Sequence, residues 1–249
     1  MKQINLRLCV AGSESLIPQF QACLNSYRIF FKIGELVIYT TENLFPKVDA
    51  ITTGKADKVT ICDVDKFYKS CFDKFPQPVK DVLEYSKNKG FKDVHSMFYL
   101  RMRLVMDYYF IDGKKPFILS DIDAFPVGDI QPILDWLNSD YVLYNADFID
   151  NYYSHCPNIT KIFGEDYFKA IPQFNNGWMC IPKGFKMNIK EVFEIMRKDI
   201  DQGPVEMAAI AISFIRNDVK TKLLPREMMV TKKDEIKGKI LAHLGPYGL

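Results

Sequence analysis

The chain alternates short apolar runs with longer amphipathic stretches. Apolar runs over residues 4–10, 35–39 and 58–62 show little alternation with polar residues, which predicts strands buried on both faces. Between the first two runs, residues 16–31 have helical spacing, with Pro18 in the first turn. Apolar strands separated by helices predict a largely parallel sheet covered by helices, with ligands at the carboxyl ends of the strands.

The same pattern continues to the end of the chain. Helical spacing predicts helices over residues 80–89, 94–110, 130–137, 190–200 and 205–215, and further strands are expected over 117–119, 141–144, 179–181 and 220–224. Residues 147–169 lack a clear period, so we interpret them as an irregular lid or acceptor loop. Because no linker, repeat or low-complexity tract interrupts the chain, we expect residues 1–249 to form a single domain.

Two carboxylates end the apolar run that begins at Phe117. Asp121 and Asp123 are two residues apart, so in an extended chain their side chains lie on the same face. Like charges at that spacing repel, and a hard divalent cation such as Mg²⁺ or Mn²⁺, shared with a phosphate substrate, would compensate them. Taken alone, an Asp-x-Asp pattern more often marks a solvated turn at a strand end than a metal site.

Other charged residues leave alternatives open. Asp63 and Asp65 form a second Asp-x-Asp pair, which competes with the first for a metal role. Arg101 and Arg103 lie in the predicted helix upstream of Asp121. Their side chains are either solvated, with stems covering apolar surface, or present the guanidinium fork to a diphosphate.

Composition narrows the classes of function. The 33 Lys and Arg residues nearly balance 31 Asp and Glu residues, and a net charge of +2 argues against a nucleic-acid binder or a polybasic membrane anchor. The 6 cysteines include no Cys-x-x-Cys pair, which favours a reducing compartment. No run of eighteen apolar residues or signal-peptide pattern is present, so we expect a soluble cytoplasmic protein without a transmembrane segment.

Several short motifs occur in a fixed order along the chain. They are Arg103-Leu104 in a Tyr-rich helix, the strand 117–123 that ends in Asp-x-Asp, Phe174-Asn175-Asn176-Gly177, Asp201-Gln202, and the tail His243-Leu244-Gly245-Pro246. Together they resemble the motifs of GT-A fold nucleotide-sugar glycosyltransferases, particularly the retaining kind related to glycogenin and the bacterial lipopolysaccharide galactosyltransferases. The resemblance covers nearly the whole chain, and it implies an α/β fold with one mostly parallel central sheet and helices on both faces.

The resemblance also implies roles for individual residues. Asp121, Asp123 and His243 would hold Mn²⁺ or Mg²⁺ on the diphosphate of a UDP-sugar, most simply UDP-glucose or UDP-galactose. The residues at the end of the first strand, Ala11, Gly12 and Ser13, would contact the nucleotide, and Arg103 would contact the donor. Asn175, Asp201 and Gln202 would face the sugar or an unidentified glycan, lipid or protein acceptor, with Asp201 stabilising the oxocarbenium-like centre. With a poor acceptor, water would slowly hydrolyse the donor.

The sequence departs from the family pattern at two places. The tail is one residue short between His243 and Gly245 and lacks the Lys-Pro-Trp that follows in the family. Gly203 replaces an acidic residue, and Glu206 is a possible substitute that, as a base for the acceptor hydroxyl, would give inversion. Two other functions therefore stay open: a nucleotidyltransferase of related architecture, and a non-catalytic binder of sugar nucleotides or glycans. A phosphatase fits less well, because its acidic pair would follow the first strand.

Overall fold

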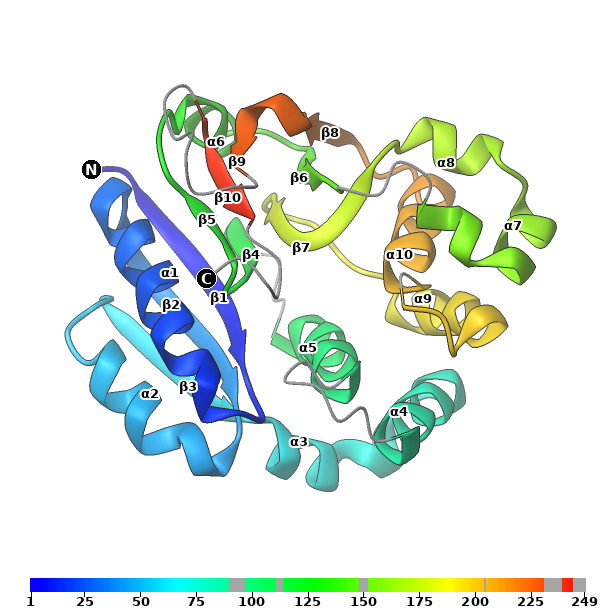
Figure 1. Ribbon diagram of the computed structural model, residues 1–249, viewed down its shortest axis with the longest axis horizontal. Coiled ribbons are helices and arrows are strands. Elements are labelled where there is room, and N and C mark those ends of the chain that lie inside the picture. The colour runs from blue at the N-terminus through cyan, green and yellow to red at the C-terminus, as the bar shows by residue number, and fades with distance from the viewer. Residues whose placement is uncertain (90–96, 111–113, 148–151, 204, 231–238, 244–249) are drawn as a thin grey trace.

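The computed structural model describes residues 1–89, 97–110, 114–147, 152–203, 205–230 and 239–243. Within these residues a seven-stranded sheet has the order β3-β2-β1-β4-β7-β6-β8 (Figure 1). Its strands are β1 (Gln3–Val10), β2 (Lys32–Thr40), β3 (Lys58–Asp63), β4 (Phe117–Asp121), β6 (Val142–Ala146), β7 (Phe174–Ile181) and β8 (Thr221–Leu224). Strand β7 runs antiparallel to both of its neighbours, and the other pairs are parallel. The expected mostly parallel sheet is confirmed.

The helices connect these strands and cover both faces of the sheet (Figure 1). They are α1 (Ile17–Phe30), α2 (Phe45–Thr52), α3 (Val64–Cys71), α4 (Gln77–Lys89), α5 (Met97–Phe110), α6 (Gln131–Trp136), α7 (Pro157–Phe163), α8 (Asp166–Ala170), α9 (Ile189–Met196) and α10 (Val205–Arg216). Short 3-10 turns are η1 (Glu14–Leu16), η2 (Glu42–Leu44), η3 (Phe72–Lys74), η4 (Tyr152–His155), η5 (Arg197–Asp199) and η6 (Arg226–Met228). None of the described helices is long and apolar enough to cross a lipid bilayer.

The two-residue period of the strands divides the interior into two apolar cores. On β4, Ile118 belongs to the core that also contains α1, α2 and α6, whereas Phe117 and Leu119 belong to the core that contains α4, α5, α9 and α10. Adjacent residues of a strand point to opposite faces, so a strand that is covered on both sides is apolar at most positions. This is why the central strands are rich in apolar residues; β1 nevertheless carries Arg7, whose side chain is ion-paired with Asp107.

A second, smaller sheet brings the end of the described chain to the middle of the molecule. It consists of β5 (Ala124–Pro126), β10 (Leu241–His243) and β9 (Met229–Val230), in the order β5-β10-β9. Strand β10 is antiparallel to β5, and this register sets His243 opposite Ala124. The backbone of His243 therefore lies beside the residue that follows Asp123.

The segment predicted to be irregular contains regular structure. Residues 157–170 form α7 and α8, so the interpretation of this part as an irregular loop is wrong; residues 148–151 lie outside the described part of the chain. The buried carboxylate of Asp199 accepts hydrogen bonds from the backbone N–H of Asn158 at 3.2 Å and of Ile159 at 2.7 Å. These bonds satisfy the first turn of α7, and no periodicity within 147–169 could have indicated them.

The apolar packing of Ile118 holds β4 in place, and a pair of substitutions tests how much this packing contributes to stability. Ile118→Ala removes a fully buried side chain and should lower the free energy of unfolding by about 2–5 kcal/mol. The matched change Ile29→Ala, at a side chain that is 70% exposed, should change it by less than about 0.5 kcal/mol. Urea unfolding followed by circular dichroism measures both, and equal effects would contradict the assignment of Ile118 to the core.

Candidate active site

Three strands bring the predicted site residues to one edge of the sheet. Strands β1 and β4 are parallel, and their register sets Cys9 beside Asp121. Strand β7 is antiparallel to β4, with Ser120 opposite Trp178, so β7 begins where β4 ends. The residues after β1, the acidic pair after β4 and Asn175 at the start of β7 therefore share the carboxyl edge, where ligands bind in sheets of this kind.

Arg103 of α5 reaches this edge from the core. Its side chain is only 3% exposed; the guanidinium forms an ion pair with Asp121, and its Nη2 donates to the carbonyl oxygen of Asn176 at 2.9 Å. Burial lowers the pKa of Arg103, but the negative charges of Asp121 and Asp107 more than offset this, and the pKa is raised overall. The alternative of a solvated side chain is wrong for both Arg101 and Arg103, which are 2% and 3% exposed.

The acidic pair is held in a tight turn. The hydroxyl of Ser120 lies within hydrogen-bond distance of the carbonyl oxygens of Asp121 and Ala124, so it bridges the turn that carries both carboxylates. The Asp121 side chain is 29% exposed and Asp123 is 9% exposed. These hydrogen bonds make Ser120 a brace of the acidic pair, a role that the sequence pattern does not indicate.

Gly177 permits the close approach of β7 to Asp121. A Cβ atom on Gly177 would lie 2.8 Å from Oδ2 of Asp121 and 2.8 Å from Oδ1 of Asn175, closer than side chains pack. The same Asn175 oxygen accepts from the N–H of Gly177 at 2.6 Å, and Nδ2 of Asn175 donates to the buried carboxylate of Asp147 at 3.0 Å. Asn175 is thus fixed beside the acidic pair, and Asp147 is a supporting residue that sequence reasoning missed.

The residues that follow β1 form the other wall of this edge. Gly12 has a φ of +94° and donates its N–H to Oγ1 of Thr41 at 3.1 Å, and a Cβ atom at this position would lie only 3.0 Å from the ring of Tyr99. Ala11 is buried beside it. Ser13 caps the following turn, where its Oγ accepts from the N–H of Ser15 at 3.3 Å. Both the positive φ and the nearby ring favour glycine at position 12.

The rival acidic pair has contacts of its own. Oδ1 of Asp63 accepts from the N–H of Lys66 at 2.9 Å and caps α3. Asp65 is hydrogen-bonded to Tyr99, and burial together with the charge of Asp63 raises the pKa of Asp65. Helix capping gives Asp63 a structural role that needs no cation.

Asp201 and Gln202 lie in the turn before α10. Asp201 is exposed, and Nε2 of Gln202 donates to its Oδ2 at 3.1 Å. The contacts described for these two residues are with each other and with the backbone of Asp199, not with Asp121. The turn is nevertheless tied to α5, because Nη2 of Arg101 donates to the carbonyl oxygen of Ile200 at 3.0 Å.

Glu206 is the other anchor of that turn. Its Oε1 accepts from Nε of Arg101 at 2.7 Å, and the two side chains are 8% and 2% exposed. Burial raises the pKa of Glu206, although the charge of Arg101 opposes this. This contact gives Glu206 a structural function and favours it over the role of a base for an acceptor hydroxyl.

The donor set suits a cation that is shared with a substrate. Sites of Mg²⁺ commonly use one or two carboxylates and complete the coordination with phosphate oxygens and water. Asp121 and Asp123 supply two such carboxylates. No group of three or more His, Cys, Asp or Glu residues converges among the described side chains. The side chain of His243 is outside that part of the structure, so its predicted role as third ligand stays a prediction.

The buried Arg101–Glu206 pair gives a direct prediction. Glu206→Gln should lower the free energy of unfolding by about 3–5 kcal/mol, because it leaves the Arg101 guanidinium buried without its counter-charge. The control Glu194→Gln, in an exposed pair with Lys190 at 3.8 Å, should change it by no more than about 0.5 kcal/mol. Chemical denaturation compares the two, and normal stability with lost activity in Glu206→Gln would instead support a role as base.

The sequence and the structure were compared with those of known proteins. No protein-family model and no curated protein matches the sequence. Among solved structures, mouse xyloside xylosyltransferase 1 superposes with a TM-score of 0.64 at 11% identity, covering 99% of each chain. The galactosyltransferase LgtC, in complex with donor and acceptor sugar analogs, gives a TM-score of 0.58 at 14% identity over 98% of this chain and 88% of that one.

The bifunctional glycosyltransferase WbbM is also similar. It has a TM-score of 0.55 at 11% identity over 98% of this chain, which corresponds to 46% of WbbM. At these identities the likeness establishes the architecture of the chain, and nothing finer. The chain has the GT-A fold of nucleotide-sugar glycosyltransferases.

Proposed function

We propose that this protein is a metal-dependent glycosyltransferase that moves a hexose from a nucleoside-diphosphate sugar to an acceptor. The observation that carries the proposal is the position of Asp121 and Asp123 at the carboxyl end of a central strand of a GT-A fold. The Arg103 guanidinium forms an ion pair with Asp121 at this position. UDP-glucose and UDP-galactose are the proposed donors, the acceptor is a glycan, lipid or protein, and residues 1–249 act as one domain.

The acidic pair would act on the leaving group of the reaction, the nucleoside diphosphate. Asp121 and Asp123, with His243 as a proposed third ligand, would hold Mn²⁺ or Mg²⁺ against the diphosphate. When bound, the cation offsets the charge that develops on the departing nucleoside diphosphate. Arg103 orients the Asp121 carboxylate and would place its own positive charge near the same diphosphate. The backbone of Ala11, Gly12 and Ser13 would bind the nucleotide.

The other side of the edge would bind the sugar and the acceptor. Asn175 is fixed by Asp147 and Gly177, so its amide has a defined direction toward this edge. Asp201 and Gln202 would face the transferred sugar, with the Asp201 carboxylate stabilising positive charge at the anomeric carbon. Arg101 acts here as a positioning residue, because it holds the turn that presents them.

Release of UDP tests this function. The protein mixed with Mn²⁺ and a panel of UDP-sugars should release UDP, slowly without an acceptor because water takes its place. Asp121→Asn and Asp123→Asn should each lower that rate roughly 100-fold or more, since each removes a charge that holds the cation. The surface change Asp166→Asn serves as the control and should leave the rate unchanged.

The outcomes also separate the alternatives. Pyrophosphate release from a nucleoside triphosphate would identify a nucleotidyltransferase, and donor binding without turnover would identify a non-catalytic binder. If no UDP-sugar is either bound or turned over, the proposal fails.

Gly177 gives a second, more local test. Gly177→Ala adds a methyl group where Asp121 and Asn175 leave only 2.8 Å, so it should displace the carboxylate and lower kcat/KM roughly 10- to 100-fold. Gly203→Ala is the matched control: apart from Gly203 and its two chain neighbours, no described atom lies within 4 Å of the added Cβ, and activity should be retained. Steady-state kinetics on folded variants would contradict this role of Gly177 if both changes behaved alike.

A further inference from the structure

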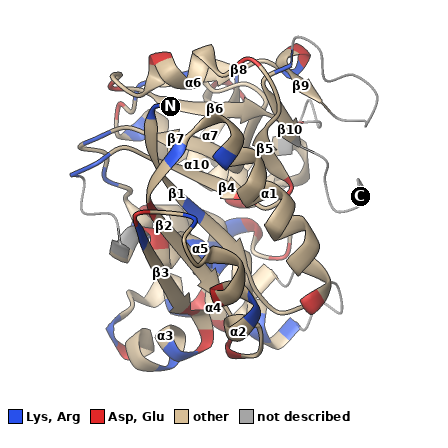
Figure 2. Ribbon diagram, turned by 90° about the vertical axis from the view of Figure 1, so that its left-hand side faces the viewer, with Lys and Arg blue, Asp and Glu red and all other residues tan. Residues whose placement is uncertain are grey.

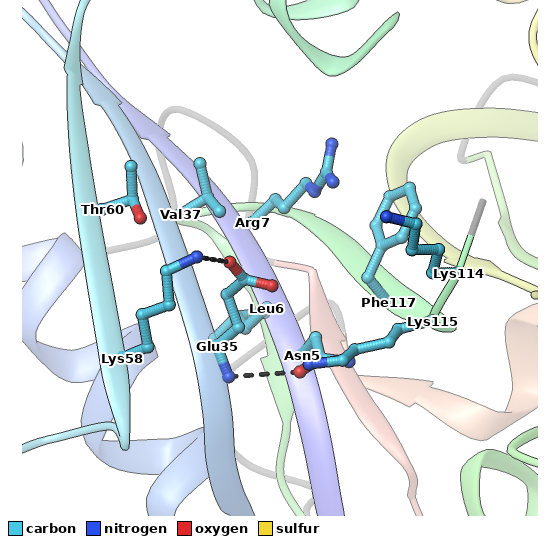
Figure 3. Close-up of a pocket in the computed structure, with 10 residues that line it drawn as sticks. All are labelled: Asn5, Leu6, Arg7, Glu35, Val37, Lys58, Thr60, Lys114, Lys115 and Phe117. Carbon is cyan, nitrogen blue, oxygen red and sulfur yellow. Dashed lines mark hydrogen bonds and ion pairs between the residues drawn. The ribbon is translucent and has the colours of Figure 1, made fainter. Parts of the chain in front are cut away.

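A polar cleft lies at the opposite edge of the sheet from the acidic pair. It has a volume of about 460 Å³ and is lined by residues near the amino-terminal ends of β1, β2 and β3 and by the start of β4 (Figure 3). Because β1 is parallel to β2 and β4, and β2 to β3, these starting residues gather at one edge. Protein sites for small ligands commonly have volumes of about 300–1,000 Å³.

Four of the ten residues that line the cleft are cationic. Arg7, Lys58, Lys114 and Lys115 contribute to its surface, and among the described residues that line it only Glu35 carries a carboxylate. Glu35 already pairs with Lys58, at 2.7 Å between Oε1 and Nζ. Arg7 is paired with Asp107, so the excess of positive charge in the cleft comes from Lys114 and Lys115; the chain as a whole is close to neutral.

Arg7 is fixed at the base of the cleft. Its guanidinium carbon lies 4.0 Å from the centre of the Phe117 ring, and its side chain is 10% exposed. Asp107 is fully buried next to Arg7. Its backbone carbonyl oxygen accepts a hydrogen bond from Nη1 of Arg7 at 3.3 Å, and Oδ1 of its carboxylate lies 3.7 Å from the same nitrogen. A guanidinium that is stacked and ion-paired loses little further freedom when it binds a ligand.

Asn5 fixes the two walls of the cleft relative to each other. Its Nδ2 donates to the carbonyl oxygen of Pro116 at 2.9 Å, which attaches the turn that carries Lys114 and Lys115 to β1. Its Oδ1 accepts from the N–H of Glu35 at 3.1 Å, across a register shift between β1 and β2. The two exposed lysines therefore project from a segment that is anchored to the sheet.

We propose that this cleft binds a small ligand that carries a phosphate group, at a site separate from the donor site. The lining offers the groups that recognise such a ligand: the planar fork of Arg7, the point charges of Lys114 and Lys115, and the polar side chains of Asn5 and Thr60. Val37 and the edge of the Phe117 ring, which packs against Arg7, give the lining an apolar part. The carboxylate of Glu35 is engaged with Lys58 and does not repel the anion strongly.

The test measures binding of inorganic phosphate and of glycerol 3-phosphate by isothermal titration calorimetry, with EDTA present so that no cation-dependent binding contributes. The wild type should bind one equivalent of each. Lys114→Ser/Lys115→Ser, which changes two exposed side chains, should weaken binding roughly tenfold or more, because it removes two charged donors. The control Lys183→Ser/Lys186→Ser removes the same charge from exposed positions outside the cleft and should keep wild-type affinity.

Three results would overturn the proposal. The first is that the wild type binds neither phosphate ligand at low ionic strength. The second is that both double variants weaken phosphate binding equally. The third is that Asp121→Asn loses phosphate binding while Lys114→Ser/Lys115→Ser keeps it in full. Sedimentation with phosphatidylcholine vesicles that contain phosphatidic acid distinguishes a lipid headgroup from a soluble phosphate ester. Either source supports the cleft if Lys114→Ser/Lys115→Ser removes the binding and the control does not.

Discussion

The buried guanidinium of Arg103 is the constraint on which the arrangement of the carboxyl edge of the sheet, with its acidic pair, depends. A charge removed from water is tolerated only with a counter-charge, and Arg103 has Asp121 at the tip of β4 and the charge of Asp107 within its own helix. Asp107 in turn accepts from the hydroxyl of Tyr39 on β2 at 2.6 Å and faces Arg7 on β1. Moving α5 against the sheet would separate these charges, so the direction of the Asp121 carboxylate is set by the whole group.

This group of charges also separates two edges with different chemistry. Among the described residues, Asp63 and Asp121 end β3 and β4 and Asp123 follows closely, whereas Lys58, Lys114 and Lys115 lie around the amino-terminal ends of β3 and β4, where Glu35 pairs with Lys58. Figure 2 shows the acidic and basic positions along the ribbon. The two sets lie on the same parallel strands, and Arg7 is only two residues before Cys9, the neighbour of Asp121. The carboxyl edge, with its acidic residues, suits a divalent cation bound to a diphosphate. The amino-terminal edge, with its lysines, suits an anionic ligand that binds without a metal ion.

Much of the fold follows from local pattern, and the supporting contacts of the site do not. The apolar runs at 4–10 and 117–119 predict buried strands, and the structure brings Asp121 and Asn175 to the same edge of the sheet. Arg101 and Glu206, however, are 105 positions apart, and nothing near either one indicates a buried pair. Likewise, α7 is capped by Asp199 from outside its own segment, which is why residues 157–170 read as irregular. Such features arise from tertiary contacts, which no window of sequence contains.

The central claim is that the tip of β4 holds a divalent cation on a nucleoside diphosphate. X-ray diffraction from crystals soaked with Mn²⁺ and a UDP-sugar, collected where manganese scatters anomalously, tests it most directly. The account predicts an anomalous peak within coordination distance, about 2.0–2.3 Å, of carboxylate oxygens of Asp121 and Asp123, with the diphosphate on its other side. A peak elsewhere on the protein, or a bound UDP-sugar whose diphosphate lies away from these two carboxylates, would contradict it.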